Sequence, residues 1–314
     1  MSDNSLIYNR LRKNFKQLNK QLKKHNFNAY RLYEKDIPEY PYIVDVYDNK
    51  AVIYEKGKKL DFSDTEQRQR HKSHALNIKS ALIDLLNITP DNIILKARTI
   101  KKGKSQYEKL AEKEQFFTVH EGEMKFRVNL TNYLDSGLFL DHRPLREIIR
   151  QQSQNKKVLN LFAYTGSLSV AAALGGGEVT TVDLSNTYID WAQENFKLNQ
   201  IKLDDHKFRK ADALNFIKNL NLKYDLIILD PPSFSNSKSM EDNFNVQDDH
   251  VWMIEKLMSC LNKGGELYFS NNLTKFKISE ELKEKFKVED ITYKTIPPEF
   301  RNKKIHQCFK ITNP

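Results

Sequence analysis

Short apolar runs alternate with helical stretches in the second half of the chain. The runs VLNLFA, EVTTVD, YDLIILD and ELYFS occupy residues 158–163, 178–183, 224–230 and 266–270. Segments with helical spacing separate them, notably residues 186–199. Strands that alternate with helices predict a mostly parallel sheet that is buried on both faces, with right-handed connections. We therefore expect an α/β fold with a doubly wound sheet and an antiparallel hairpin at its C-terminal end.

The first half of the chain has a different pattern. Apolar residues recur at helical spacing near the start, at Leu11, Phe15, Leu18 and Leu22. Residues 29–62 alternate β-type runs with turn residues, and they precede a predicted helix at about 64–87 and a strand at 92–96. A hairpin that turns near Gly122 follows. This order predicts an α+β domain over residues 1–145 and a separate sheet domain over residues 146–314.

The charge balance favours a polyanionic partner. The 314 residues carry 51 Lys and Arg against 41 Asp and Glu, which gives a net charge of +10. No acidic residue occurs between Asp3 and Glu34, and the predicted first helix is basic at Arg10, Arg12, Lys13, Lys16, Lys20, Lys23 and Lys24. This face can bind RNA phosphates or can simply be solvated, and we favour RNA.

Cysteine and histidine usage limits the chemistry. Only Cys260 and Cys308 are present, which excludes a disulfide framework and a cysteine-rich zinc site and fits a reducing cytosol. The N-terminal residues lack the apolar core of a signal peptide, and no apolar run is long enough to span a membrane. We therefore expect a cytoplasmic protein. His71 and His74 share a predicted helix face, and we expect exposed polar residues there rather than metal ligands.

Candidate cofactor residues follow the first two strands of the predicted sheet. The first strand leads into Tyr164, Thr165, Gly166 and Ser167 and then into a helix rich in small residues. Ligands of doubly wound sheets bind at the carboxyl ends of such strands. Asp183 ends the next strand and can accept hydrogen bonds from a ribose or cap a helix. Asp212 follows a later strand and can accept from the amine of an adenine or cap a helix. Because the glycine fingerprint of dinucleotide-binding folds is absent, a nicotinamide dehydrogenase is disfavoured.

The strand YDLIILD continues directly into a stiff proline turn. Asp230, Pro231, Pro232, Ser233 and Phe234 form this turn. Proline removes backbone donors and fixes φ, so Asp230 and nearby carbonyl groups can accept hydrogen bonds from a base edge. Phe234 can stack on an extruded base; the alternative is a core position. Asn271 and Asn272 follow the next strand, where their amides can donate to a purine carbonyl oxygen or close a turn.

These residues resemble the ordered motifs of class I S-adenosylmethionine (SAM)-dependent RNA methyltransferases. The matching segments are NLFAYTGS (160–167), Val182-Asp183, Asp212-Ala213 and DPPSF (230–234). Over nearly its whole length the chain further resembles RlmK-type 23S rRNA (guanine-N7)-methyltransferases, the C-terminal half of the bacterial RlmKL fusion. Long segments carry this likeness, among them NRLRKNFKQL, LTNYLDSGLFLDHR, DPPSFSNSKSMED and RNKKIHQCFKIT. The resemblance implies a Rossmann-like methyltransferase fold and SAM as the cofactor.

The resemblance also implies a set of site residues. Asp183 would hold the ribose, Asp212 would lie near the adenine, and the Asp141–Arg143 segment would close over the methionine end of SAM. The full set of expected cofactor-binding residues is Asp141, Arg143, Asn160, Phe162, Tyr164, Thr165, Gly166, Ser167, Asp183, Leu184, Asp212 and Ala213. Asp230, Pro231, Pro232 and Phe234 are the expected catalytic residues. The substrate contacts are expected at Phe234, Asn271, Asn272, Lys102 and Lys104.

Nitrogen 7 of guanine carries a free lone pair, so the implied reaction needs no general base and no metal. Catalysis would consist of holding the nucleophile and the methyl group in line. Asp230 would bind the base edge and stabilise the cationic product. The implied partner is 23S ribosomal RNA. Because the chain begins at Met1 with the RlmK-like segment, we expect the second activity of the fusion to be absent or to reside on a separate chain. The expected partner is then an RlmL-like methyltransferase or a helicase.

Three other functions stay open. Methylation of an exocyclic base amine suits a Pro-Pro turn and is the strongest alternative. Carbon-5 methylation of cytosine requires a thiolate nucleophile, but neither Cys260 nor Cys308 is near the Pro-Pro turn in sequence. A non-catalytic RNA-binding factor of ribosome assembly would also use the basic helix and the KKGK segment, although the SAM motifs argue against it.

Overall fold

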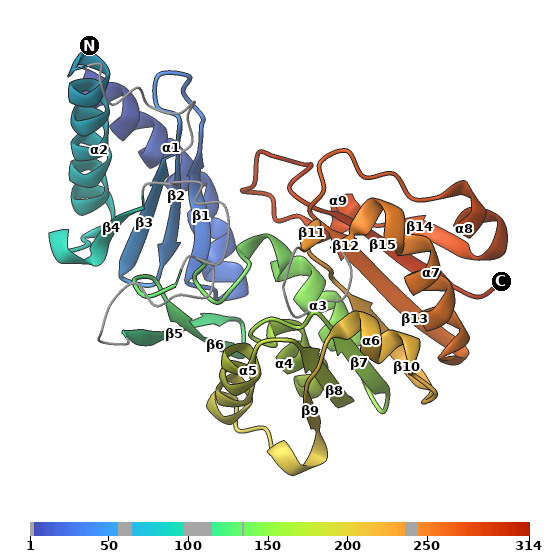
Figure 1. The fold of residues 1–314 in the computed structure, drawn as a ribbon. Coiled ribbons are helices and arrows are strands. Elements are labelled where there is room, and N and C mark those ends of the chain that lie inside the picture. The colour runs from blue at the N-terminus through green and yellow to red at the C-terminus, as the bar shows by residue number, and fades with distance from the viewer. Residues whose placement is uncertain (1–2, 56–64, 97–114, 134, 236–243) are drawn as a thin grey trace. The chain divides into compact units, whose positions relative to one another are not determined.

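The computed structural model describes residues 3–55, 65–96, 115–133, 135–235 and 244–314, which form two compact units (Figure 1). The first unit comprises Met1–Glu123, Val128–Ser136 and Pro298–Arg301, and the second comprises Met124–Arg127, Gly137–Pro297 and Asn302–Pro314. The domain boundary that we expected at residues 145 and 146 stays a prediction. Lys102 and Lys104 lie outside the described residues. None of the helices in the described segments is long and apolar enough to cross a membrane.

The first unit is a four-stranded sheet with two long helices. Its elements are α1 (Asp3–His25), β1 (Ala29–Glu34), β2 (Tyr42–Tyr47), β3 (Lys50–Glu55), α2 (Thr65–Leu86), the 3-10 turn Pro90–Asn92 and β4 (Ile93–Lys96). The strand order is β1-β2-β3-β4, in which only the β3–β4 pair is parallel. This arrangement confirms the strands, the second helix and the α+β character that the sequence predicted for this part of the chain.

Helix α1 is amphipathic, as its sequence predicts. Ile7, Leu11 and Leu18 are buried, and Phe15 and Leu22 pack partly buried against the same core. Six of the basic residues on the rest of the helix are exposed, namely Arg12, Lys13, Lys16, Lys20, Lys23 and Lys24. We call these six residues the basic stripe. The apolar residues anchor the helix to the sheet, and the basic stripe stays available to solvent.

The expectation of exposed histidines in α2 is wrong for His74. This side chain is 5% exposed and stacks on Tyr40, with 4.2 Å between the ring centroids. His71 is half-buried, and its Nδ1 lies 2.8 Å from Glu55 Oε1 and 3.0 Å from the Tyr42 hydroxyl. The pair therefore belongs to the packing of α2 on the sheet. The helical spacing is correct, but spacing alone does not tell which face of a helix meets a tyrosine-rich sheet.

The second unit contains the predicted parallel sheet. Earlier in the chain, β5 (Phe116–Glu121), which belongs to the first unit, and β6 (Met124–Asn129) form a separate two-stranded sheet, which confirms the predicted hairpin. The elements that follow are the 3-10 turn Leu140–His142, α3 (Arg143–Gln152), β7 (Lys157–Leu161), α4 (Ser167–Leu174), β8 (Glu178–Asp183), α5 (Asn186–Leu198), the 3-10 turn Leu203–Asp205, β9 (Lys207–Lys210), α6 (Ala213–Lys218), β10 (Tyr224–Leu229), β11 (Phe234–Ser235), β12 (Phe244–Asn245), α7 (Val246–Ser259), β13 (Leu261–Asn271), α8 (Glu280–Lys285), β14 (Lys287–Asp290), α9 (Thr292–Thr295) and β15 (Gln307–Thr312).

The strand order of this sheet is β14-β15-β13-β10-β7-β8-β9. The five strands from β13 to β9 are parallel, and β15 and β14 add the expected antiparallel hairpin. Because β8 and β9 extend the sheet on one side of β7 whereas β10 and β13 extend it on the other, the switch point lies between β7 and β10. The carboxyl ends of these two strands therefore form the ligand-binding edge of a doubly wound fold.

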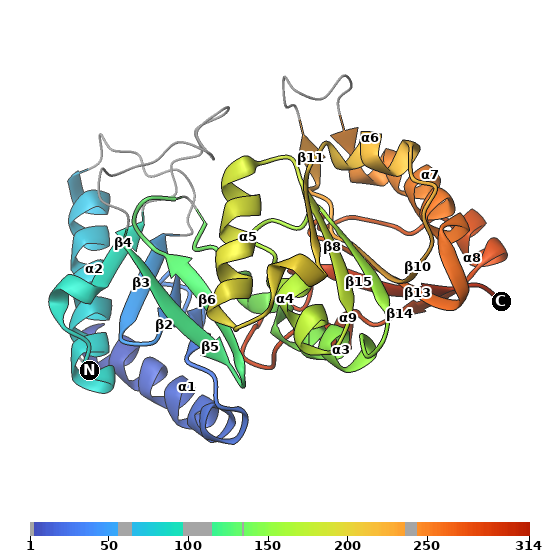
Figure 2. The ribbon, with the colours of Figure 1, turned by 90° about the horizontal axis from the view of Figure 1, so that it is seen from below.

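Helices cover both faces of the sheet (Figure 2). Residues of α6, α7 and α8 pack with one core cluster, whereas residues of α3 and α4 pack with a second cluster on the opposite face. Strand β10 shows why both faces are apolar, since Ile227 and Leu229 belong to the first cluster and Leu226 and Ile228 belong to the second. The two-residue period of a strand sends alternate side chains to opposite faces. The continuous apolar run in YDLIILD is thus explained by burial on both faces.

Side chains of α5 bind the backbone of β6 as a neighbouring strand would. Trp191 Nε1 donates to the Arg127 carbonyl oxygen over 2.8 Å, and the Arg127 N–H donates to Asn195 Oδ1 over 2.8 Å. Four residues further on, Asn199 accepts from the Lys125 N–H over 2.8 Å and donates to its carbonyl oxygen over 2.6 Å. Four helical residues rise about 6 Å and two strand residues about 6.8 Å, so the spacings match.

The two asparagines of this ladder offer a matched test of burial. Asn195 is fully buried and also donates to the Thr165 carbonyl oxygen, whereas Asn199 is half-buried. Asn195→Ala leaves buried backbone groups unpaired and should lower the free energy of unfolding by about 2–4 kcal/mol, measured by urea denaturation. Asn199→Ala should cost less than about 1 kcal/mol, because water can replace its amide. Equal losses for the two variants would show that burial does not set the strength of this ladder.

Candidate active site

The turn after β7 has an unusual backbone. Phe162 has a φ of 56°, Tyr164 a φ of 52° and Gly166 a φ of 72°. The left-handed region costs a non-glycine residue about 1–2 kcal/mol, so this turn persists only if its surroundings hold it. Gly166 is required for a second reason, because a Cβ at this position would lie 2.7 Å from the Cβ of Ala192. Strained backbone at a switch point is typical of a ligand-binding turn.

Buried polar groups hold this strained turn in place. Asp183 Oδ2 accepts from the Tyr164 N–H over 2.8 Å, and Oδ1 of the same carboxylate accepts from the Ser185 N–H over 2.9 Å. The Thr165 hydroxyl donates to the Gly137 carbonyl oxygen over 2.6 Å, and Asn195 donates to the Thr165 carbonyl oxygen over 2.9 Å. One carboxylate thereby joins the end of β8 to the turn after β7.

The structure separates the two roles that the sequence left open for Asp183. The N-cap of α5 is Ser185, whose hydroxyl accepts from the Tyr188 N–H over 3.4 Å, so Asp183 does not cap this helix. Burial raises the pKa of Asp183, and the N–H groups of Ser185, Tyr164 and Leu184 partly oppose this shift. Each carboxylate oxygen has two acceptor sites, and these backbone donors use only part of that capacity. The remaining sites suit the paired hydroxyls of a ribose.

Asp212 does cap a helix. Its Oδ1 accepts from the N–H groups of Leu214 and Asn215 over 2.8 and 3.1 Å, which fixes the start of α6. Ala213 is the first residue of this helix and is buried. The capping alternative is therefore confirmed, and the contact of Asp212 with an adenine stays a prediction.

Asn160 lies within β7 beneath this edge and is 1% exposed. Its Nδ2 donates to the Ser169 hydroxyl over 2.9 Å, and Ser169 also accepts from the Thr181 hydroxyl over 2.8 Å. Asn160 Oδ1 has no hydrogen-bond partner among the described residues. Asn160 thus links β7 to α4, the helix that begins at Ser167, and these two elements flank the turn.

The second strand of the switch point ends in the proline turn. Leu229 of β10 pairs with Leu161 of β7 in parallel register, so Asp230 and Phe162 are the next residues at the same edge. Pro231 is buried and Pro232 is exposed. Phe234 is 60% exposed in β11, which is short and pairs with β12. This exposure excludes the core alternative for Phe234 and leaves its ring free to stack on a flat ligand.

The end of β13 meets the proline turn. The Ser233 hydroxyl donates to Asn272 Oδ1 over 2.6 Å, which links the two segments directly. Asn271 is 1% exposed, and its Oδ1 accepts from the Leu273 N–H over 3.1 Å. Its Nδ2 has no hydrogen-bond partner within the described part of the chain. A buried amide donor without a partner costs about 1–3 kcal/mol, and such atoms are expected where a ligand binds.

A histidine cluster lies against Asp230, and sequence reasoning missed it. His142 Nδ1 lies 3.6 Å from Asp230 Oδ2, and His142 Nε2 lies 3.2 Å from the Ser270 hydroxyl. His306 Nδ1 lies 2.8 Å from Asp141 Oδ2. The sequence pointed to the segment Asp141–Arg143 for its arginine, which begins α3. Only the fold brings the start of α3, the end of β10 and the residue before β15 together, so no sequence signal could have found this cluster.

The same cluster is better described as a hydrogen-bond network than as a metal centre. Ligand-type atoms of Asp141, His142 and His306 lie within 4.8 Å of one another. Each ring already has its own partners, however. The Thr295 hydroxyl donates to the Thr292 carbonyl oxygen over 2.9 Å and lies 2.9 Å from His306 Nε2. Both ring nitrogens of His306 therefore already face a protein partner, Asp141 on one side and Thr295 on the other.

The two sides of this network differ in how readily their side chains carry a charge. Burial on its own would raise the pKa of Asp141, but His142 and His306 outweigh it and hold this pKa well below the usual range. Burial lowers the pKa of His142, although Asp230 and Asp141 oppose the shift; His306 and Arg146 add to it. His142 is therefore neutral at neutral pH. An uncharged ring beside Asp230 leaves the negative charge of that carboxylate directed to whatever binds at the edge of the sheet.

The lowered pKa of His142 predicts a loss of stability in acid. Below the ordinary histidine pKa of about 6.5, the unfolded chain binds a proton that folded His142 does not bind, so stability falls as the pH drops. When the pH falls from about 7.5 to about 5.5, the free energy of unfolding should decrease less in His142→Gln than in the wild type. Below pH 6.5 the two slopes should differ by up to about 1.4 kcal/mol per pH unit. Urea denaturation at several pH values measures this. The exposed His25→Gln serves as the control, and a wild-type slope in His142→Gln would contradict the assignment.

Comparisons with known proteins identify relatives of the chain. The chain is 46% identical over 313 residues to a "Ribosomal RNA large subunit methyltransferase K/L" of Pseudoalteromonas atlantica, and 45% identical over 316 residues to a Legionella pneumophila protein of the same name. The alignments cover 98% and 100% of this chain but 44% of each relative. The chain thus spans less than half of the length of these relatives.

Solved structures confirm the fold. A putative SAM-dependent methyltransferase from Streptococcus mutans superposes with a TM-score of 0.74 at 21% identity, covering 99% of this chain and 82% of the other. A putative methyltransferase complexed with SAH gives a TM-score of 0.72 at 23% identity, covering 97% and 81%. Both support the Rossmann-like fold.

The sequence profile of one family matches most of the chain, including the strained turn, Asp183 and the proline turn. It is described as "S-adenosylmethionine-dependent methyltransferase" and matches residues 91–308. The expected cofactor is thereby confirmed as that of the family. The chain belongs to the S-adenosylmethionine-dependent methyltransferases.

Proposed function

We propose that this chain transfers the methyl group of SAM to nitrogen 7 of a guanosine in 23S ribosomal RNA. The observation that carries the proposal is the pairing of two turns at one edge of the sheet. The strained turn after β7, held by Asp183, suits the nucleoside of SAM, and the turn at Asp230–Phe234 presents a carboxylate and an exposed ring one strand away. Methyl donor and base would then be held side by side, as in-line transfer requires.

Ribosomal RNA is the proposed substrate for two reasons. The curated relatives are named as methyltransferases of the large-subunit ribosomal RNA. Independently, the basic stripe of α1 and the net charge of +10 suit a phosphate backbone. The first domain would therefore bind RNA. A separate RlmL-like methyltransferase or helicase remains part of this proposal as a partner.

The residues present fit the SAM nucleoside. SAM supplies an electrophilic methyl group on a sulfonium sulfur. Asp183 retains acceptor sites for ribose hydroxyls, and the turn Tyr164–Gly166 brings backbone close to the edge of the sheet. Leu184 adds a partly exposed apolar side chain beside Asp183. Asp141 and Arg143 remain the proposed contacts with the methionine end, although Asp141 already accepts from His306.

The surroundings of Asp230 favour a nucleophile that needs no general base, such as nitrogen 7. Attack by this atom releases no proton and creates a cationic base. The carboxylate of Asp230 would stabilise that cation, and the neutral ring of His142 would not oppose it. The Nδ2 of Asn271, which has no partner among the described residues, would donate to the carbonyl oxygen at position 6 of the guanine. In these roles Asp230 and Asn271 bind and position the base, and neither removes a proton.

The cysteines do not support a thiolate route. Cys260 and Cys308 are both buried. Burial, with a smaller contribution from the negative charge of Asp230, raises the pKa of Cys308 far above its usual value. A thiol in that environment is a poor nucleophile, because the thiolate is the reactive form. Carbon-5 methylation of cytosine, which needs such a nucleophile, is therefore disfavoured by the structure as well as by the sequence.

Variants of the proline turn test the proposed roles on unmodified 23S ribosomal RNA with labelled SAM. Asp230→Asn should lower kcat about 10–100-fold with unchanged SAM affinity, because it removes the charge that stabilises the product cation. Phe234→Ala should raise KM for the RNA about tenfold, since stacking on one base contributes about 1–3 kcal/mol. Tyr293→Ala is the control, as this ring is 81% exposed on α9.

Two outcomes would contradict these roles. Full activity of Asp230→Asn together with unchanged RNA affinity of Phe234→Ala would remove both residues from the base-binding site. Tight SAM binding without any transfer to RNA, in the wild type, would instead favour the assembly-factor alternative.

A further inference from the structure

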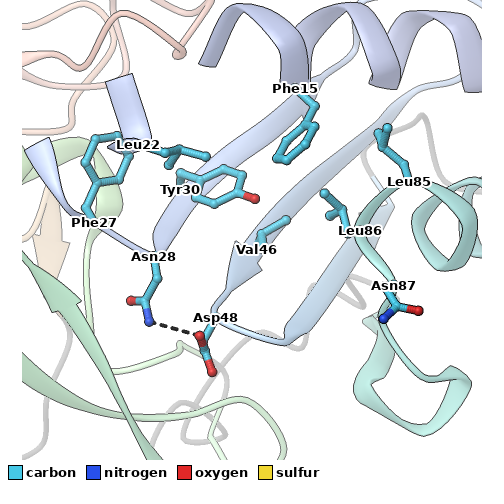
Figure 3. A pocket seen from close by; sticks show the side chains of 10 residues that line it. All are labelled: Phe15, Leu22, Phe27, Asn28, Tyr30, Val46, Asp48, Leu85, Leu86 and Asn87. Carbon is cyan, nitrogen blue, oxygen red and sulfur yellow. Dashed lines mark hydrogen bonds between the residues drawn. The ribbon is translucent and has the colours of Figure 1, made fainter. Parts of the chain in front are cut away.

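The first unit contains a pocket that the proposed reaction does not use (Figure 3). Its volume is about 390 Å³, within the range of small-ligand sites of roughly 300–1,000 Å³. It opens between α1 and the end of α2, over strands β1 and β2. The lining residues are Phe15, Leu22, Phe27, Asn28, Tyr30, Val46, Asp48, Leu85, Leu86 and Asn87.

The hydroxyl group of Tyr30 points into this pocket. Tyr30 is 6% exposed, and Figure 3 shows its hydroxyl directed between Phe15, Val46 and Leu86. Within the described residues this hydroxyl makes no hydrogen bond. The hydroxyl faces the open pocket, where it can donate one hydrogen bond and accept others. A ligand with a polar edge could therefore bind to it.

The walls and the rim of the pocket differ in character. Phe15, Leu22 and Leu86 form apolar walls on which a flat ring can pack. At the rim, Asn28 Nδ2 donates to Asp48 Oδ1 over 3.1 Å, and both Asp48 and Asn87 are exposed. The rim thus offers a carboxylate that accepts and an amide that both donates and accepts. Apolar walls with a few polar edge groups suit a heterocyclic base.

Positive charge beside the pocket indicates that the molecule that carries this base is a polyanion. Helix α1 supplies Phe15 and Leu22 to the wall, and Lys16 and Lys23 directly follow them in sequence. At 100° per residue, Arg12, Lys16 and Lys23 lie within one sector of the helix, next to the sector of the wall residues. All three are exposed. A polyanion that follows the basic stripe therefore passes beside the pocket.

We propose that this pocket binds an unpaired nucleobase of the RNA whose phosphates lie along the basic stripe of α1. The base would pack between Phe15 and Leu86, and its edge would pair with the Tyr30 hydroxyl and the rim groups. This inference rests on the proposed function only in that the partner is RNA. It adds a second contact, remote in sequence from the catalytic turn, that would select single-stranded over paired segments of the substrate.

Binding of a fluorescent single-stranded RNA of about 15 nucleotides, without SAM, tests the pocket by anisotropy. Tyr30→Phe removes one hydroxyl and should weaken binding about fivefold, the effect of one hydrogen bond. Leu22→Ala opens the wall and should also weaken binding. Leu6→Ala is the matched control, because Leu6 is 43% exposed on the same helix and does not line the pocket. Binding of a duplex of the same length should be equal in all four proteins.

Photo-crosslinking of the same strand with 4-thiouridine provides a second measurement. Crosslinks should map to peptides that contain Phe15 or Tyr30, and Tyr30→Phe should reduce their yield. Unchanged affinity in both pocket variants, or crosslinks confined to other peptides, would overturn the pocket. Because no methyl transfer is involved, crosslinks in the pocket of a protein that fails to methylate RNA would contradict the proposed function and leave the pocket standing.

Discussion

The carboxylate of Asp183 is the constraint on which the rest of the site depends. It accepts from the N–H groups of Tyr164 and Ser185, and so it joins the ends of β8 and β7. The turn that it holds contains non-glycine residues in the left-handed region, which only a well-packed and fully bonded environment keeps ordered. Asn195 supports the same turn from α5 while it also binds β6. A single polar framework thereby fixes the edge of the sheet at which SAM is proposed to bind.

The parallel register of β7 and β10 places the proline turn beside the strained turn. Since Leu229 pairs with Leu161, the turn at Asp230 begins where the strained turn begins. The histidine cluster then sets the charge at this edge. Asp141 and His306 form a tightly bonded pair, and His142 stays neutral between them and Asp230. An anionic Asp230 beside a neutral ring suits a base that becomes cationic on methylation, which is the physical basis for proposing guanine nitrogen 7.

Local pattern was sufficient to predict the elements but not the contacts between them. The strands of the parallel sheet and the proline turn were predicted because YDLIILD and DPPSF carry a period and a turn chemistry that act over a few neighbouring residues. The partner of His142, the ladder from Trp191 to β6 and the place of Tyr30 in the wall of a pocket were not predictable, because they depend on residues distant in sequence. His74 shows the same limit, since its spacing identified a helix face but not the tyrosine that covers it.

The identity of the methylated atom decides between the proposed chemistry and its rivals, and mass spectrometry of the product can determine it. The protein would be incubated with labelled SAM and 23S ribosomal RNA from a strain that lacks this gene, and the RNA would be digested to nucleosides. We expect label on a guanosine at nitrogen 7, recognisable by the fixed positive charge of the modified base. Label on an exocyclic amine or on a cytosine would keep the fold and the cofactor but contradict the roles proposed for Asp230 and His142.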